Sequence, residues 1–232
     1  MDWQDFAQRM ASMAADLLRQ ESSDAMLYRI VSSAVDIVEG CDSAGILLRD
    51  NDRIETLACT DALAKESDRL QERLGEGPCF DIAVAREKGG APVSRTEDLT
   101  ELRQRWPHYA PAARELGIGS MMTFLLFADA EEFGTLTMYA HRPGAFTGVS
   151  ETAGILLASH AAVALSGART HTQLHSALTT RHVIGEAMGI LMERCHLDED
   201  AAFALLRELS QQRNLKLWSI AQRVCESGGI EN

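Results

Sequence analysis

The run GEGPC, residues 75–79, holds a cysteine whose local sequence could make it reactive. Gly75 is predicted to end a helix, Gly77 and Pro78 to force a turn, and Cys79 to begin the next helix. A thiol at a helix N-terminus can have a lowered pKa, and such a thiolate reacts with oxidants and electrophiles. A free cysteine is also a small hydrophobe that packs well into a tight turn. The sequence leaves both roles open for Cys79, sensing and packing.

A second chemically useful group lies in the run GEAMGILMERC, which has helical periodicity. One arc of the helical wheel is predicted to be core, and it holds Ile184, Ala187, Met188, Leu191 and Cys195. A different arc holds Arg181, His182, Gly185, Gly189, Met192 and His196. Each helical glycine costs about 0.5–1 kcal/mol relative to alanine. Two glycines on this arc therefore indicate that a helix, a protein or a nucleic acid approaches the backbone closely there. Its cation and two imidazoles suit a phosphate backbone or a shallow RNA minor groove.

Further polar residues follow where one predicted helix gives way to the next. Arg213 and Lys216 lie at this junction, and Trp218 either stacks on an unpaired base or packs inside the bundle. Arg207 is either a solvated, salt-bridging side chain or a base reader. Ser210 and Asn214 are most simply a helix end and its stop, whatever else they contact.

Enzymatic and metal chemistry have little support in the sequence. No nucleophile–base pair and no catalytic pair of carboxylates can be picked out, so we expect the protein not to be an enzyme. His108, His141 and His160 are isolated from other ligand types, so no metal site is expected. GEGPC lacks the Lys and Ser/Thr that follow the glycines of a phosphate-binding loop. No cofactor is evident.

The composition favours a cytoplasmic protein. The 232 residues are 46% hydrophobic, which supports a substantial core. The polar start MDWQDFAQRM does not resemble a signal peptide, and no window is expected to reach the ~18 apolar residues of a membrane span. The five cysteines are widely spaced and form no CxxC, which argues against a zinc site and a disulfide framework.

The formal charge of −12 is divided unevenly. Residues 1–168 contain 15 Lys and Arg against 26 Asp and Glu, whereas residues 169–232 contain 7 against 8, with four histidines. Neither part has the strongly basic stripe that marks nucleic-acid binding from charge alone. A nucleic-acid module of this charge should bind weakly as a monomer and depend on two copies for avidity.

The hydrophobic pattern predicts a mixed α/β domain followed by a small helical bundle. Two helices are expected first, the second over residues 27–38, and then hairpins over 43–50 with 53–60 and over 120–127 with 134–141. Further expected elements are helices at 62–74, from 79 to about 87, and at 107–116, and a strand at 91–96. The order predicts a mainly antiparallel sheet flanked by helices, ending near residue 165.

From residue 153 to 195, positions spaced alternately by three and four residues run without interruption. Their occupants are only partly apolar, so a strong continuous zipper is not predicted. Two interpretations remain: a single rod that carries a signal and a dimer seam, or two separate helices in similar phase. Asp198 is predicted to cap a following helix that stops at Asn214, and a third helix is expected over residues 216–226.

The run RHVIGEAMGILMER…DEDAAFALLRELSQQRNLKLWSIAQRV resembles the ANTAR domain over about residues 171–228. The matching positions extend over all three predicted helices, which makes the resemblance specific. It implies a dimeric RNA-binding module that binds paired stem-loops in nascent transcripts and prevents a terminator from forming. The RNA-binding residues expected on this basis are Arg181, His182, Gly185, Gly189, Met192, Arg207, Ser210, Arg213, Asn214, Lys216 and Trp218.

Residues of about 20–165 resemble a GAF domain, of the kind that precedes ANTAR modules in actinobacteria. The resemblance rests on GEGPC, APVSRTEDL, RWPHYAPAARELGIGSMM and GTLTMYAHRPGAFT. It implies an antiparallel sheet that encloses a small-molecule pocket used for sensing. Candidate pocket or sensing residues are Cys79, Trp106, Met121, Thr123, Tyr139 and His141, with the ligand unspecified.

The expected organisation is therefore a GAF sensor at 1–165, a helical linker at 166–180 and an ANTAR domain at 171–230. The expected function is a cytoplasmic, signal-responsive antitermination regulator that binds tandem stem-loop RNA as a homodimer, with an upstream signalling protein as a further partner. The alternative is a protein-interaction module, in which the C-terminal bundle docks a partner and the GAF domain senses a small molecule or a redox state.

Overall fold

The computed structural model describes residues 3–20, 22–50, 53–87, 93–102, 104–128 and 132–229. Within these ranges it leaves out the side chains of residues 3, 86, 87, 128, 132, 169 and 171–178. The chain forms two compact units, residues 1–167 and residues 168–232, and each is described by itself.

The N-terminal unit is built on a five-stranded sheet whose order is β2-β1-β5-β4-β3 and whose neighbouring strands are all antiparallel. Its strands are β1 (Ser43–Asp50), β2 (Arg53–Cys59), β3 (Val93–Thr96), β4 (Ser120–Ala128) and β5 (Glu132–Ala140). This confirms the predicted fold class and both predicted hairpins. The first two residues of the predicted strand 91–96 lie outside the described residues.

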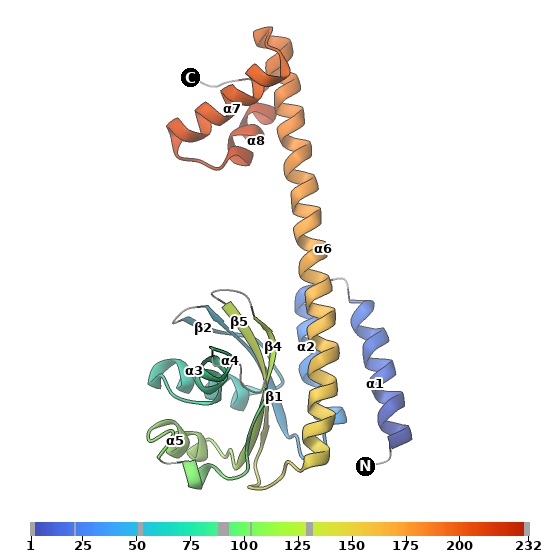
Figure 1. Cartoon of the computed structure of the whole chain (residues 1–232), viewed down its shortest axis with the longest axis vertical. Helices are drawn as coiled ribbons and strands as arrows, with labels where there is room; N and C mark the ends of the chain where they lie inside the picture. Colours follow the sequence, from blue (N-terminus) through green and yellow to red (C-terminus); the bar gives the residue numbers. More distant parts are fainter. Residues whose placement is uncertain are drawn as a thin grey trace. The chain divides into compact units, whose positions relative to one another are not determined.

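Helices cover both faces of this sheet (Figure 1). On one face lie α2 (Ser23–Ile37), with α1 (Trp3–Leu18) packed beside it, and the beginning of α6 (Gly148–Cys195). The other face is covered by α3 (Ala62–Leu74), α4 (Pro78–Glu87) and α5 (Tyr109–Glu115). A short 3₁₀ turn, η1 (Leu99–Leu102), was not predicted from the sequence.

The C-terminal unit is a small helical bundle, as predicted. It contains the end of α6, α7 (Glu199–Arg213) and α8 (Leu217–Ser227). Its core holds Ala187, Leu191, Ala202, Leu206, Ile220, Ala221 and Val224. Asp198 accepts a hydrogen bond from the Ala201 N–H at 2.8 Å and so caps α7, while Asn214 ends it in the left-handed conformation at φ 50°. Cys195, predicted to be core, is exposed because it is the last residue of α6.

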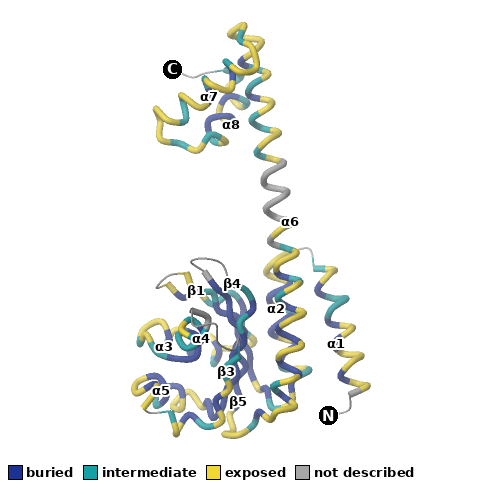
Figure 2. The backbone as a smooth tube through the Cα atoms, viewed as in Figure 1, coloured by how far each residue is buried: buried dark blue, intermediate teal, exposed yellow. Residues whose placement is uncertain are grey.

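A single continuous helix, α6, connects the two units with 48 residues. The interpretation as two separate helices is therefore wrong for the backbone. Seam positions Leu174 and Ala177 lie outside the described side chains. By length and composition, residues 148–168 are long and apolar enough to cross a membrane, contrary to the sequence expectation. However, the inner side of this segment, including Ala153 and Leu157, is buried against the domain (Figure 2).

Candidate functional site

The GEGPC segment joins three helices of the N-terminal unit. Gly75 ends α3 in the left-handed conformation at φ 64°, and Gly77 has φ 125°. The Glu76 carboxylate accepts hydrogen bonds from the backbone N–H groups of His108 and Tyr109, both at 2.9 Å, and so holds the start of α5. The Gln71 side-chain carbonyl accepts a hydrogen bond from the Cys79 N–H at 2.9 Å, which holds the start of α4.

Cys79 is buried in this arrangement, with 1% of its surface exposed. Burial raises the pKa of its thiol to about 12, although the nearby charge of Arg49 acts in the opposite direction. The helix N-terminus therefore does not activate this thiol. Of the two roles left open by the sequence, packing of a tight turn fits the geometry.

We expect Cys79 to be alkylated far more slowly than the exposed Cys195 in the folded protein. A pKa raised from 9.0 to about 12 lowers the thiolate fraction at neutral pH about a thousandfold. The measurement is a time course with iodoacetamide at pH 7.5, followed by mass spectrometry of each cysteine peptide. Equal labelling rates at Cys79 and Cys195 would contradict the packing role.

The other predicted pocket residues divide between the core and the surface. Trp106, Met121 and Tyr139 pack in one core cluster, and Thr123 is buried with its hydroxyl 3.2 Å from that of Thr137. His141 does not join them: it is exposed, and its Nδ1 lies 3.0 Å from the Gly117 carbonyl oxygen. Met121, Thr123 and Tyr139 thus share one interior face of the sheet, where they and Trp106 are buried in a packed core.

Asp68 is the polar centre of this interior face and was missed by the sequence analysis. Only 2% of its surface is exposed. Thr56 donates a hydrogen bond to its carboxylate at 2.8 Å, and the Tyr139 hydroxyl donates to it at 3.4 Å. Burial raises the pKa of this carboxyl to about 7, against the opposing effect of the two hydroxyl donors. The signal in the sequence was a polar stripe on the inner side of α3, formed by Ser67, Asp68 and Gln71.

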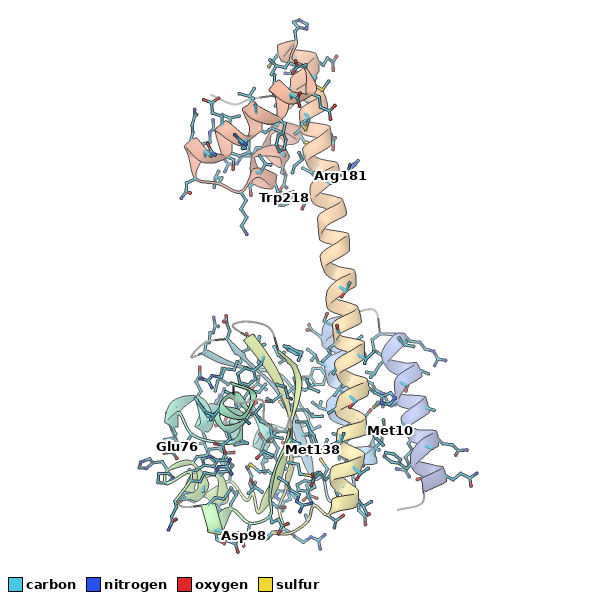
Figure 3. All side chains as sticks on the ribbon, in the orientation of Figure 1. Met10, Glu76, Asp98, Met138, Arg181 and Trp218 are labelled. Atoms are coloured by element: carbon cyan, nitrogen blue, oxygen red, sulfur yellow. The ribbon has the colours of Figure 1, made fainter. Side chains whose placement is uncertain are left out.

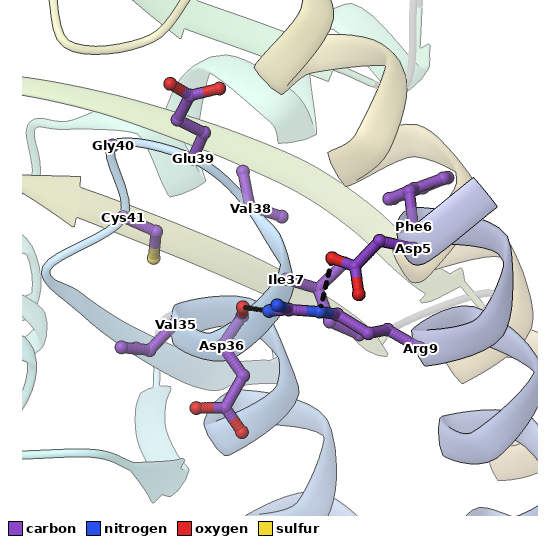
Figure 4. Close-up of a pocket in the computed structure, with 10 residues that line it drawn as sticks. All are labelled: Asp5, Phe6, Arg9, Val35, Asp36, Ile37, Val38, Glu39, Gly40 and Cys41. Carbon is purple, nitrogen blue, oxygen red and sulfur yellow. Dashed lines mark hydrogen bonds and ion pairs between the residues drawn. The ribbon is translucent and has the colours of Figure 1, made fainter. Parts of the chain in front are cut away.

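A surface cleft of about 280 Å³ lies beside the end of α2 (Figure 4). Arg9 of α1 reaches into it, donates a hydrogen bond to the Asp36 carbonyl oxygen at 2.9 Å and pairs with Asp5 at 2.9 Å. The cationic group of this cleft is therefore already engaged by carbonyl and carboxylate oxygens of the same unit. The Arg9 hydrogen bond fastens α1 to the end of α2, and Phe6 and Met10 on the apolar side of α1 are buried.

In the C-terminal unit, four of the residues predicted to bind RNA line one groove between α6 and α7. We call it the glycine groove, and its volume is about 440 Å³. Its lining residues are Arg181, Ile184, Gly185, Met188, Gly189, Met192, Glu199, Asp200 and Phe203. A Cβ atom added to Gly185 or Gly189 would meet nothing within 4 Å, so the predicted close approach is open.

The charges around the glycine groove differ from the prediction. Glu199 and Asp200, in the first turn of α7, line it together with Arg181. The same two carboxylates place favourable negative charge at the N-terminus of α7. Because two carboxylates repel phosphate, this groove is a poorer phosphate site than its arginine and glycines implied.

The remaining predicted RNA residues lie around the α7–α8 turn. Arg213, Lys216 and Trp218 are exposed there, and we call these three the junction face. Trp218 keeps 38% of its surface exposed, so the interpretation of a side chain packed inside the bundle is not supported; Figure 3 labels it together with Arg181. Ser210 donates a hydrogen bond to the Leu215 carbonyl oxygen at 2.6 Å, and it shapes the turn.

Two further arginines of this unit, Arg207 and Arg223, lie on α7 and α8. Arg207 is exposed on α7, as either interpretation of it required. Arg223, which the sequence analysis did not single out, lines a shallow cleft with Arg213 at the ends of α7 and α8. Among the described residues, no group of three His, Cys, Asp or Glu side chains could hold a metal ion.

The comparisons agree with this architecture. A GAF domain model matches residues 20–166, which is more than half of the chain, so the protein belongs to the GAF family. An ANTAR domain model matches residues 172–224, and the chain is thus a GAF domain followed by an ANTAR domain, the arrangement of a GAF–ANTAR regulator. No curated protein sequence matches the chain.

Solved structures with the same fold come from varied sensory and enzymatic proteins. The GAF domain of a phosphoenolpyruvate-protein phosphotransferase from Coxiella burnetii has a TM-score of 0.55 and 15% identity, and the match covers 75% of this chain and 99% of that one. The Stigmatella aurantiaca phytochrome photosensory core module has a TM-score of 0.61 and 14% identity, with 90% and 45% covered. Free methionine-R-sulfoxide reductase from Neisseria meningitidis has a TM-score of 0.53 and 15% identity, with 72% and 91% covered. At such low identities the similarity shows the fold alone.

Proposed function

We propose that this protein is a cytoplasmic, non-enzymatic regulator that binds stem-loop RNA in nascent transcripts and promotes antitermination. The observation that carries the proposal is the ANTAR match over a bundle whose surface presents cations and an exposed aromatic ring beside one turn. The GAF unit supplies the sensory part, and its signal is a small molecule or an upstream signalling protein.

The junction face is the part of the bundle best suited to hold RNA. Arg213 and Lys216 offer positive charge, and Trp218 offers an exposed ring on which an unpaired loop base can stack. Arg223 adds a further cation, since it lines one cleft together with Arg213, and Arg207 is exposed elsewhere on α7. No acidic residue lines the cleft that Arg213 and Arg223 share. We therefore place the phosphate contacts at the junction face rather than in the glycine groove.

We further propose that two copies act together through α6. Within the N-terminal unit, the outer side of this helix exposes Ile155 at 43%, Leu156 at 39% and Val163 at 75%. Thr152, Ser159, His160 and Gly167 are exposed with them, and no Asp, Glu, Lys or Arg is exposed between residues 149 and 168. A second copy would cover these apolar side chains and would bring two RNA-binding units to paired stem-loops.

Reversing the charge of the junction face should weaken RNA binding. In a gel-shift titration of the full chain with tandem stem-loop RNA, we expect Arg213→Glu and Lys216→Glu each to raise Kd at least about tenfold. Each lost phosphate contact should also reduce the slope of log K against log salt by about 0.7–0.9.

The matched control is Arg53→Glu, which reverses an exposed charge on the sheet of the N-terminal unit and should leave Kd unchanged. A duplex DNA of equal length should bind more weakly than the RNA. If the parent chain binds no RNA at any salt, or prefers the DNA, the proposed function is wrong.

A further inference from the structure

The glycine groove is an apolar surface that the fold of the bundle leaves open. Met192 and Phe203 keep 38% and 40% of their surfaces exposed along it, whereas Leu191, Ala202 and Leu206 of the same bundle are buried. Its floor at Gly185 and Gly189 has no side chain at all, and nothing stands within 4 Å of either glycine's missing Cβ. Two glycines that weaken a helix and leave room above it indicate an occupant that approaches the backbone.

The ends of the groove carry opposite charges. Arg181 lines it from the beginning of this stretch of α6, and Glu199 and Asp200 line it from the start of α7, just beyond the end of α6. Within the described residues, no salt bridge engages any of these three side chains. An occupant with an acidic end and a basic end would therefore find both charges available.

If the two α6 segments run antiparallel, a second copy of the groove presents its acidic end to the basic end of the first copy, and its basic end to the acidic end. Gly185 and Gly189 lie two residues on either side of position 187, and Arg181 and Met192 lie six and five residues from it. A two-fold axis that crosses the exposed glycine side of α6 at the level of residue 187 thus brings Gly185 of one copy opposite Gly189 of the other, where the backbones need to be closest. It also brings Arg181 of each copy to the acidic end of the other groove, so the surface is self-complementary.

We propose that the glycine groove is a contact between two copies of this bundle, related by a two-fold axis and closed by ion pairs from Arg181 to Glu199 and Asp200 of the other copy. Phe203 and Met192 are covered in this contact, and the glycines let the two helices approach. RNA is the less favourable occupant, because the carboxylates repel phosphate. This contact is separate from the apolar outer side of α6 around Val163, and it does not depend on RNA binding.

The test uses mixing of charge-reversed full-length chains. All chains carry Val163→Glu, which removes the other proposed dimer contact at an exposed position. One variant adds Arg181→Glu, and the other adds Glu199→Arg with Asp200→Arg. Each variant alone should self-associate at least about tenfold more weakly than the Val163→Glu parent in sedimentation equilibrium, because like charges now meet at both ends.

An equimolar mixture of the two variants should recover association, since each acidic end then faces a basic one. Glu186→Arg, a charge reversal on α6 outside the groove lining, is the control and should associate like the parent. Gly189→Leu is a second variant that leaves the charges alone. It should stabilise the helix by its higher propensity yet raise the Kd of association, because its side chain fills the open floor.

Three results would overturn the proposal. The first is a mixture that associates no better than its separate components, and the second is a parent that stays monomeric at millimolar concentration. The third is unchanged association together with weaker RNA binding by Gly189→Leu, which would assign the groove to RNA. Circular dichroism of each variant verifies that α7 still forms after the reversal of its first turn.

Discussion

Replacing Asp68 by Asn is expected to stabilise the N-terminal unit at pH 8 by about 4 kcal/mol relative to the parent. The carboxyl has a pKa of 3.8 when unperturbed and of about 7 in the fold. The folded state therefore binds a proton more tightly than the unfolded state, so the contribution of Asp68 is intact below about pH 4. It is lost as the pH rises towards 7, because a buried charge must then be kept among hydroxyl groups.

Amide hydrogen exchange in β1 and β5 of the full-length chain measures this effect, since it reports the free energy of opening of that unit. Parent and Asp68→Asn should differ by little at pH 4 and should diverge up to pH 8. Glu72→Gln, which changes an exposed carboxylate on the same helix, should follow the parent at every pH. Parallel curves for parent and Asp68→Asn would show that the carboxyl does not titrate in the fold.

Gly119→Ala should destabilise the same unit by about 3 kcal/mol or more, because the added methyl group would clash with backbone atoms, which cannot move aside as a flexible side chain can. An added Cβ would lie 2.6 Å from the Arg142 carbonyl carbon and as close to the Pro143 nitrogen, and both are backbone atoms. The chain cannot withdraw easily, since the Gly119 N–H donates to the Ala140 carbonyl oxygen at 2.8 Å.

The control is Gly148→Ala at the first residue of α6, where an added Cβ meets nothing within 4 Å. Urea unfolding followed by circular dichroism should show the N-terminal transition shifted to lower urea for Gly119→Ala only. An unchanged midpoint would mean that the segment around residues 141–143 is free to move away.

Local sequence pattern predicted most elements of the fold because the signals are themselves local. The hairpins at β1–β2 and β4–β5 are bounded by turn residues, and Ser22, Asp61 and Asp198 each accept the capping hydrogen bond expected of such side chains. The pairing of β1 with β5 joins residues about ninety positions apart, so no local pattern could specify it. The prediction that His141 lines a pocket was misleading, because β5 ends at Ala140 and the next side chain turns outward.

The candidate RNA surface was predicted in its residues but not in its charge. Helical periodicity correctly brought Arg181, Gly185 and Gly189 together, since a helical wheel needs only sequence spacing. It could not show that Glu199, Asp200 and Phe203 form the facing wall, because that depends on how α7 packs against α6. The suitability of this stripe of α6 for phosphate therefore depends on the charges that α7 places opposite it.

The hydrogen bonds of GEGPC also restrict how the sensory unit can respond. The end of α3 and the starts of α4 and α5 are fastened to one another by Gln71 and Glu76 within a few residues. We therefore expect a stimulus at that side of the sheet to move the three helices together, as one lid. Gln71→Leu, which removes the bond to the Cys79 N–H, would release one edge of this lid and let it move in parts.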